Sequence, residues 1–266
     1  DDLIEFCKLM MPDFIVGKHH RILADLLMGI ESGEKDRICV NIPPRHGKSQ
    51  LVSIFFPAWF LGRNPDKKVM MVSHTTDLAV DFGRKVRNLI ALDVYRSIFP
   101  TVKLAQDSKS AGRWNTNVGG EYYACGIGSA LAGRGADLLL VDDPHSEQDV
   151  INGNFGVFEK AYEWFTFGAR TRLMPNGAVA IIQTRWHLDD LTGRVVRDMG
   201  KNERADQYEV VEFPAILDVL DKKTEKTIQK PLWPEFFDLE ALLRTKASMP
   251  VFQWNSQYQQ QPTTEE

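Results

Sequence analysis

The sequence has 266 residues, a net charge of −4 and 26% charged residues. This length suits one large domain, or one domain with a small appendage. The hydrophobic content of 43% is that of a globular protein and excludes a disordered tail, a collagen-like fibre and a coiled coil. The negative charge argues against a protein that coats nucleic acid through bulk positive charge, but it leaves local basic patches possible.

Cysteines, apolar stretches and chain ends carry little chemistry of their own. Cys7, Cys39 and Cys125 are widely spaced, which favours reduced thiols in a cytosolic protein over a disulfide framework or zinc cluster. The longest apolar stretch, residues 51–61, is too short to span a bilayer, so no membrane partner is expected. The chain begins without Met and ends in a linker-like Gln/Pro/Thr/Glu segment, so we expect an excised piece of a longer protein.

Apolar segments of strand length alternate with segments of helical periodicity along the first 200 residues. This alternation predicts an α/β fold in which a mainly parallel sheet is covered on both faces, a three-layer α/β/α arrangement. We assign 1–200 to this core, 201–255 to a smaller subdomain and 256–266 to a linker. In chain order, the predicted elements are a helix over 19–33, a strand over 37–42, a helix over 50–61 kinked at Pro57, a strand over 68–73, a helix over 76–92, strands over 121–125 and 137–142, a helix over 155–169, a strand over 177–184 and a helix over 188–198.

A glycine-containing turn follows the first predicted strand. Lys48 in this turn would reach the β- and γ-phosphates of a nucleotide, and the Ser49 hydroxyl would bind Mg²⁺. Gly47 lets the backbone approach closely, and Arg45 adds a guanidinium beside the phosphates. The common pattern G-x-x-x-x-G-K-[ST] fails only at its first position, which is Ile42. The predicted nucleotide-binding residues are Arg45, His46, Gly47, Lys48, Ser49 and Gln50, with ATP and Mg²⁺ as cofactors.

A pair of acids ends another predicted strand. In Leu138-Leu-Leu-Val-Asp-Asp143 the first acid, Asp142, is placed to assist the Mg²⁺ of a phosphate-loop enzyme. Asp143 follows where a carboxylate that activates water is needed. Many enzymes of this kind have Glu at this point, so Glu147 is kept as the alternative base.

Three segments in this order resemble a known family. They are Ile42-Pro-Pro-Arg-His-Gly-Lys-Ser49, Asp137-Leu-Leu-Leu-Val-Asp-Asp-Pro-His145 and Ile181-Ile-Gln-Thr-Arg-Trp-His187. Together with residues 252–262, they resemble the large terminase subunit of tailed bacteriophages, the ATPase that pumps DNA into a capsid. The resemblance spans nearly the whole chain.

The resemblance implies a P-loop fold of the ASCE type with a C-terminal lid, and ATP-driven translocation of double-stranded DNA. It also implies a homo-oligomeric ring, often pentameric, in the host cytoplasm at the procapsid portal, with the portal protein and the small terminase subunit as partners. The family's C-terminal nuclease needs about 150–200 further residues, so nuclease activity is not expected of this chain.

Four further positions match functional residues of the family. His20 matches a residue that contacts adenine, where the family often has Gln. Arg134, in Leu131-Ala-Gly-Arg-Gly135, matches an arginine that reaches into the neighbouring subunit's site. Thr184 and Arg185 match a coupling motif beside the γ-phosphate. Each position also has an ordinary structural interpretation, such as an arginine paired with a nearby acid.

The surface that meets DNA is left open by the sequence. Three basic clusters are candidates, although for any one of them a solvated face is the favoured interpretation: Lys201/Arg204, Lys222/Lys223/Lys226 and Arg84/Lys85/Arg87. A superfamily 2 helicase is an alternative, because Ser73-His-Thr-Thr76 resembles that group's nucleic-acid motif, although 266 residues cannot hold its two lobes. A non-catalytic nucleotide-binding assembly module is a third interpretation, prompted by Ile42 and Asp143.

Overall fold

The computed structural model describes residues 1–108 and 110–263, and its centre is a seven-stranded sheet in the order β3-β4-β2-β5-β6-β1-β7. The strands pair in parallel except β3, which lies antiparallel to β4 at one edge. The predicted α/β class is therefore confirmed. The strands are β1 (Arg37–Asn41), β2 (Lys68–Ser73), β3 (Arg113–Asn115), β4 (Glu121–Gly126), β5 (Ala136–Asp142), β6 (Leu173–Gln183) and β7 (Glu209–Glu212).

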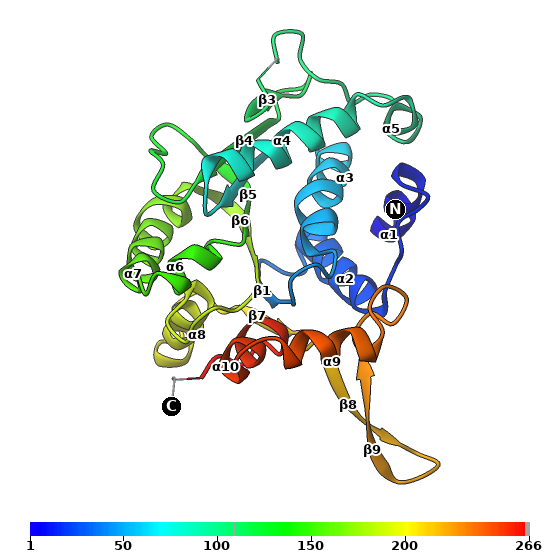
Figure 1. Cartoon of the computed structure of the whole chain (residues 1–266). Helices are drawn as coiled ribbons and strands as arrows, with labels where there is room; N and C mark the ends of the chain where they lie inside the picture. Colours follow the sequence, from blue (N-terminus) through cyan, green and yellow to red (C-terminus); the bar gives the residue numbers. More distant parts are fainter. Residues whose placement is uncertain (109, 264–266) are drawn as a thin grey trace.

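Side chains alternate along each strand and build two separate cores. Ile38 and Val40 of β1 belong to one core, while Cys39 between them belongs to the other. Figure 1 shows helices on both sides of the sheet. The first core is covered by α1 (Leu3–Met10), α2 (Lys18–Ser32), α3 (Phe56–Arg63), α4 (Thr76–Ile90) and α5 (Asp93–Ile98). The second core lies under α7 (Gly156–Glu163), the helical turn η2 (Trp164–Ala169) and α8 (Leu191–Lys201). The short α6 (Glu147–Ile151) precedes α7, and the turn η3 (Arg170–Arg172) follows η2.

The helix after the phosphate loop is not uniform. Its first part, η1 (Gln50–Phe55), has π-helical spacing, and α3 continues from Phe56 without a break. Pro57 has no N–H, and its ring conflicts with the carbonyl of Ser53 in a regular α-helix. A wider turn ahead of the proline relieves that conflict, which explains why the expected kink takes this form.

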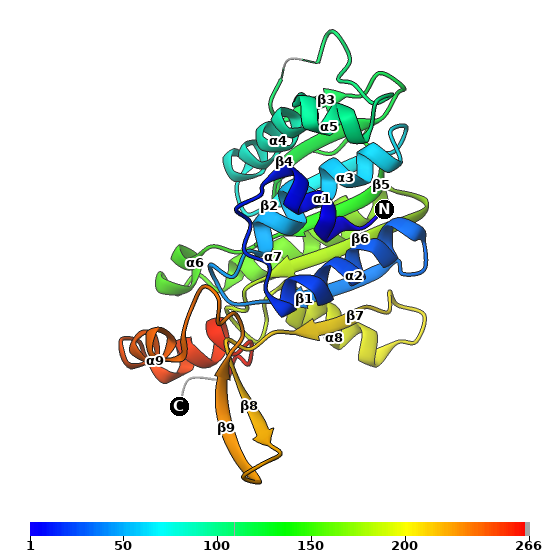
Figure 2. The same ribbon diagram turned by 90° about the vertical axis from the view of Figure 1, so that its right-hand side faces the viewer.

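The boundary expected at residue 200 is displaced. β7 pairs in parallel with β1, so the sheet of the core extends to Glu212. The smaller C-terminal part follows, with the antiparallel hairpin β8 (Ile216–Asp221) and β9 (Lys226–Pro231), then α9 (Leu239–Ala247), α10 (Val251–Gln253) and η4 (Trp254–Tyr258). The hairpin projects away from the sheet (Figure 2).

The expected linker over 256–266 also differs from the structure. Ser256 lies within η4, and Ser256 and Gln260 are both buried. Residues 264–266 of that segment lie outside the described residues. The C-terminal part has its own small core, formed by Ala215, Ile216, Leu242 and Trp254. Along the described ranges, no helix combines the length and apolar character needed to cross a membrane.

Candidate functional site

The phosphate loop lies where the sequence predicts it, between β1 and η1 at the carboxyl edge of the sheet. Arg45 and Gly47 adopt left-handed backbone conformations, with φ of 58° and 81°. Such angles are easy for glycine and unfavourable for arginine, so the loop is held in a specific shape. The Lys48 side chain is turned inward and buried, whereas Arg45 is exposed to solvent.

Lys48 and the two acids meet at this edge. The Nζ of Lys48 lies 2.6 Å from Oδ2 of Asp143. Burial on its own would lower the pKa of Lys48, but the Asp143 and Asp142 carboxylates outweigh burial and raise it. Because β6 lies between β1 and β5, the loop and the acids come from strands that are not neighbours.

Asp142 is fully buried beneath the loop. Its Oδ2 accepts a hydrogen bond of 2.5 Å from the Ser53 hydroxyl, while its Oδ1 is buried with no hydrogen-bond partner among the described residues. Burial and the neighbouring Asp143 charge raise the pKa of Asp142, although Lys48 and the hydroxyls of Ser53 and Ser49 oppose the shift. A buried, unsatisfied carboxylate oxygen beside a hydroxyl is a donor set that suits a hard divalent cation.

Asp143 is fixed by three strands. Its φ of 47° is left-handed, and its N–H donates to the Ile182 carbonyl of β6. Its own carbonyl accepts from the N–H of His74, at the end of β2, and its Oδ1 accepts from the N–H of Thr184 at 3.1 Å. One carboxylate oxygen of Asp143 thus contacts Lys48, and the other accepts from Thr184, directly after β6.

Thr184 joins the phosphate loop to β6. Its hydroxyl donates a 2.8 Å hydrogen bond to the carbonyl of Ile42, the residue that enters the loop. Together with the bond from its N–H to Asp143, this contact connects both nucleotide motifs to one residue. Thr184 therefore lies between the phosphate loop and Asp143.

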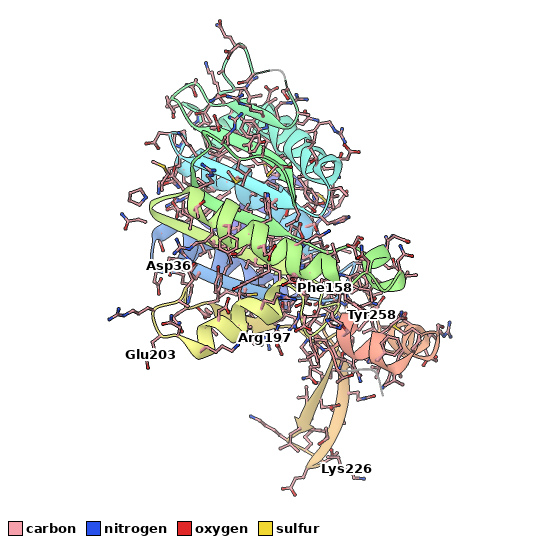
Figure 3. The ribbon with its side chains drawn as sticks, turned by 90° about the vertical axis from the view of Figure 1, so that its left-hand side faces the viewer. Asp36, Phe158, Arg197, Glu203, Lys226 and Tyr258 are labelled. Atoms are coloured by element: carbon pink, nitrogen blue, oxygen red, sulfur yellow. The ribbon has the colours of Figure 1, made fainter. Side chains whose placement is uncertain are left out.

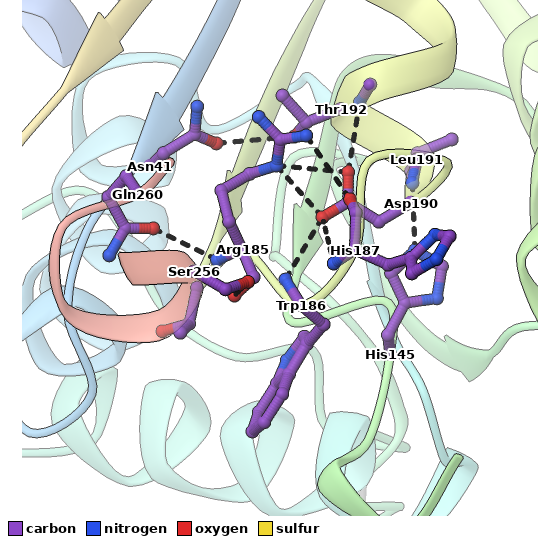
Figure 4. A network of polar contacts seen from close by, with 12 residues as sticks. Asn41, His145, Arg185, Trp186, His187, Asp190, Leu191, Thr192, Ser256 and Gln260 are labelled. Carbon is purple, nitrogen blue, oxygen red and sulfur yellow. Dashed lines mark hydrogen bonds and ion pairs between the residues drawn. The ribbon is translucent and has the colours of Figure 1, made fainter. Parts of the chain in front are cut away.

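Arg185 lies next to the site but does not face it. Its Nε contacts both carboxylate oxygens of the fully buried Asp190, at 3.1 and 2.9 Å (Figure 4). Its N–H donates to Oε1 of Gln260, and its carbonyl accepts from the hydroxyl of Ser256 (Figure 4). Arg185 therefore connects β6 to the C-terminal part, and of the two residues of this motif only Thr184 contacts the loop and Asp143.

Arg134 lies at the opposite edge of the sheet. One residue, Gly135, separates it from β5, whose seven residues end at Asp142, about 20 Å further on at 3.3 Å per step. Its guanidinium lies 3.4 Å from the Glu121 carboxylate and 4.5 Å from the centre of the Tyr123 ring. Arg134 is therefore not assembled into the site of its own chain.

His20 occupies a different place from the expected adenine contact. The ring is fully buried, its Nδ1 accepts from the Gly17 N–H, and its Nε2 lies 2.8 Å from the carbonyl of His46. Both ring nitrogens are therefore used by backbone groups behind the loop, and none is left for a base. His46 is also buried, with its Nδ1 bonded to the Pro44 carbonyl.

Two other expected site residues lie further out. The side-chain amide of Gln50 is directed toward Met11 Sδ, 3.7 Å away, and Glu147 is an exposed residue at the start of α6. The sequence prediction missed Ser53, which follows Ser49 by one helical turn and could have been found from that spacing. It also missed Asp190, Ser256 and Gln260, which no local pattern connects to Arg185.

Comparison with known proteins agrees with this geometry. The family model for the N-terminal part of T4likevirus-type terminase large subunits matches residues 39–241, which is more than half of the chain. The chain belongs to this terminase family. No curated protein sequence matches the terminase chain.

Solved structures show the same fold. The HK97 bacteriophage large terminase matches the terminase chain with a TM-score of 0.61 at 13% identity, over 98% of this chain and 55% of that one. The ATPase domain of the Thermus phage P74-26 large terminase matches with a TM-score of 0.52 at 16% identity, over 87% of this chain and 90% of that one. The chain thus spans about half of the HK97 protein's length, and these likenesses concern the fold.

Proposed function

We propose that this chain is the ATP-hydrolysing motor domain of a viral terminase, which drives double-stranded DNA into a procapsid. The observation that carries the proposal is the meeting of Lys48, Asp142 and Asp143 beneath a left-handed phosphate loop, with Lys48 2.6 Å from Asp143. In an enzyme of this type, the lysine binds the β- and γ-phosphates and the strand-end acids serve the metal and the water.

Lys48 changes partner when a nucleotide binds. The γ-phosphate attracts its ammonium away from Asp143, and the carboxylate is freed to accept a proton. A water oxygen then attacks the γ-phosphorus, the bond from that phosphorus to the β,γ-bridging oxygen breaks, and ADP and phosphate result. Asp143 is preferred to Glu147 as the base because the Thr184 N–H orients it, whereas Glu147 lies exposed on α6.

The residues present fit a Mg²⁺ ion. Asp142 and Ser49 would hold it, and the unpaired Oδ1 of Asp142 would gain a partner. Bound there, Mg²⁺ would offset phosphate charge. No group of three or more His, Cys, Asp or Glu side chains forms a metal site among the described residues, and a Mg²⁺ held largely by phosphates and water needs none.

Arg134 would act on a neighbouring subunit. Its place at the amino edge of the sheet separates it from its own phosphate loop by the length of β5. In a homo-oligomeric ring, which we propose to be a pentamer at the portal, it would stabilise charge on the neighbour's transferring phosphoryl group. ATPase activity per subunit should therefore rise steeply with protein concentration; activity independent of concentration would contradict this role.

The hairpin β8–β9 is the proposed DNA contact. Arg84 and Lys85 are ion-paired with Asp81 on α4, whereas Lys222, Lys223 and Lys226 are exposed and form no ion pair in the part of the chain that the structure describes. Lys226 lies on the hairpin far from the sheet (Figure 3).

Salt dependence of DNA binding tests this contact. Each phosphate contact adds about 0.9 to the slope of log affinity against log salt, so removing the three lysines should lower the slope by up to about 2.7. A variant with alanine at Lys201 and Arg204 tests the other exposed candidate cluster by the same measurement. An unchanged slope in the hairpin variant would exclude the hairpin.

The helicase alternative is not favoured. Its basis, Ser73-His-Thr-Thr76, lies beside the acids: His74 donates its N–H to the Asp143 carbonyl. The segment thus contacts the acids after β5 and, through Ser73 and Thr76, the end of β4. Absence of phosphate release at any protein concentration would instead favour the non-catalytic assembly module.

A further inference from the structure

Two buried histidines converge on one carbonyl of the phosphate loop. His19 and His20 are consecutive residues in the first turn of α2, and both are buried. The Nε2 of His19 lies 2.9 Å from the His46 carbonyl oxygen, and the Nε2 of His20 lies 2.8 Å from the same atom. A carbonyl oxygen has two lone pairs, so it can accept from both rings.

Hydrogen bonding fixes the state of the His20 ring. The Gly17 N–H donates to Nδ1 over 2.9 Å, so Nδ1 carries no proton and Nε2 carries the proton given to His46. Burial, with the neighbouring His19, lowers the pKa of His20 to about 3, which agrees with a neutral ring. His20 is therefore a fixed donor behind the loop.

Anchoring this carbonyl sets the direction of the next amide. The peptide bonds of the described residues are all trans, so the N–H of Gly47 points opposite to the His46 carbonyl. With the carbonyl held toward α2, that N–H points away from α2 and is left free to donate to a phosphate. The ring also fills the space behind Gly47, because a Cβ added there would collide with the His20 Nε2.

Two aromatic residues of the C-terminal part pack against the histidines at the loop. Trp233 packs edge-on against the His20 ring, with centres 4.8 Å apart, and Phe237 packs against the His46 ring at 5.2 Å. Both residues follow β9, beyond the main sheet. The support of the loop is thus shared between α2 and the C-terminal part.

We propose that His19 and His20 are positioning residues of the phosphate loop, which orient the Gly47 N–H toward a bound nucleotide by holding the His46 carbonyl. This inference rests on the proposed nucleotide-binding function. It assigns the histidines a role behind the loop rather than a contact with the base.

Nucleotide affinity of matched variants tests the proposal. His20→Ala should raise the Kd for ATP about tenfold, the change expected when a buried hydrogen bond is lost. His20→Gln, whose amide can still donate to His46, should restore affinity to within about threefold. Leu27→Ala removes a buried side chain two turns along α2 and controls for general destabilisation, which thermal unfolding of each variant measures.

The outcomes separate the proposals. Affinity lost in His20→Ala, restored in His20→Gln and retained in Leu27→Ala supports positioning. Equal loss in His20→Ala and Leu27→Ala would reduce the histidine to a structural role and overturn the proposal. If the wild-type chain binds no ATP, the proposed nucleotide-binding function is wrong. The hydrogen bond from His20 to the His46 carbonyl can still be tested by ¹⁵N NMR of the histidine rings: a His20 ring protonated on Nδ1 rather than Nε2 would contradict that bond.

Discussion

Thr184→Val removes a single hydroxyl from the junction between the phosphate loop and β6. The side chain is buried, and its hydroxyl donates over 2.8 Å to the carbonyl of Ile42. Valine keeps the shape and leaves the N–H bond to Asp143 in place. The substitution therefore tests one hydrogen bond, with Thr184→Ser as the variant that keeps the hydroxyl.

The expected effect follows from that bond's burial. Leaving a buried carbonyl unpaired costs about 1–3 kcal/mol in the free energy of unfolding. At about 2–4 °C per kcal/mol for a chain of this size, the melting temperature should fall by several degrees. A loss of about 1.4 kcal/mol in transition-state positioning would lower kcat/KM for ATP about tenfold.

Two measurements check this prediction. Urea unfolding gives the free-energy difference between the variants, and steady-state phosphate release gives kcat and KM. Thr184→Ser should remain close to wild type in both. If Thr184→Val matches Thr184→Ser in stability and in kcat/KM, the inference that this hydroxyl joins the loop to β6 is refuted.

Three further outcomes are expected. Lys48→Ala should abolish phosphate release, because it removes the cation for the β- and γ-phosphates; turnover above one hundredth of wild type would argue against the assigned site. Arg134→Ala should remove activity yet leave the Kd for ATP unchanged, and normal turnover would exclude its role between subunits. Stability should fall on acidification: burial lowers the pKa of His20 to about 3 and of His46 to about 4, so the fold keeps both rings neutral while the unfolded chain binds protons below pH 6.5. Protonation of each histidine in the unfolded chain should lower the free energy of unfolding by about 2 kcal/mol between pH 7 and 5. Urea unfolding midpoints measure this change, and equal midpoints at both pH values would contradict the lowered pKa values of the two histidines.

A variant sharpens the pH experiment. His20→Gln does not titrate in this range, so its stability should depend less on pH than that of the wild type. Asp142 acts in the opposite direction, because its pKa is raised and protonation favours the fold as pH falls. The histidines outnumber it, so a net loss toward acid is expected.

The sequence by itself determined the fold class and the two nucleotide motifs. Each motif is local: a glycine turn between a buried strand and a helix, and acids at the end of an apolar strand, both occupy fixed places in any parallel α/β sheet. The approach of Lys48 to Asp143 follows from strands whose carboxyl ends share one edge. Thr184 was predicted from the family resemblance, and its place directly after β6 brings it to the same edge.

Only the tertiary structure decided the longer connections. β7 is a short strand whose place depends on pairing with β1, so periodicity ended the core too early. Arg185 contacts Asp190, Ser256 and Gln260, and the contacts with Ser256 and Gln260 join distant segments. The spacing of these residues in the sequence does not predict their contacts. The orientation of His20 also depends on tertiary contacts. A histidine before a phosphate loop can face the ligand or the back of the loop, and the hydrogen bonds to Gly17 and His46, with Trp233 packed against the ring, hold it at the back.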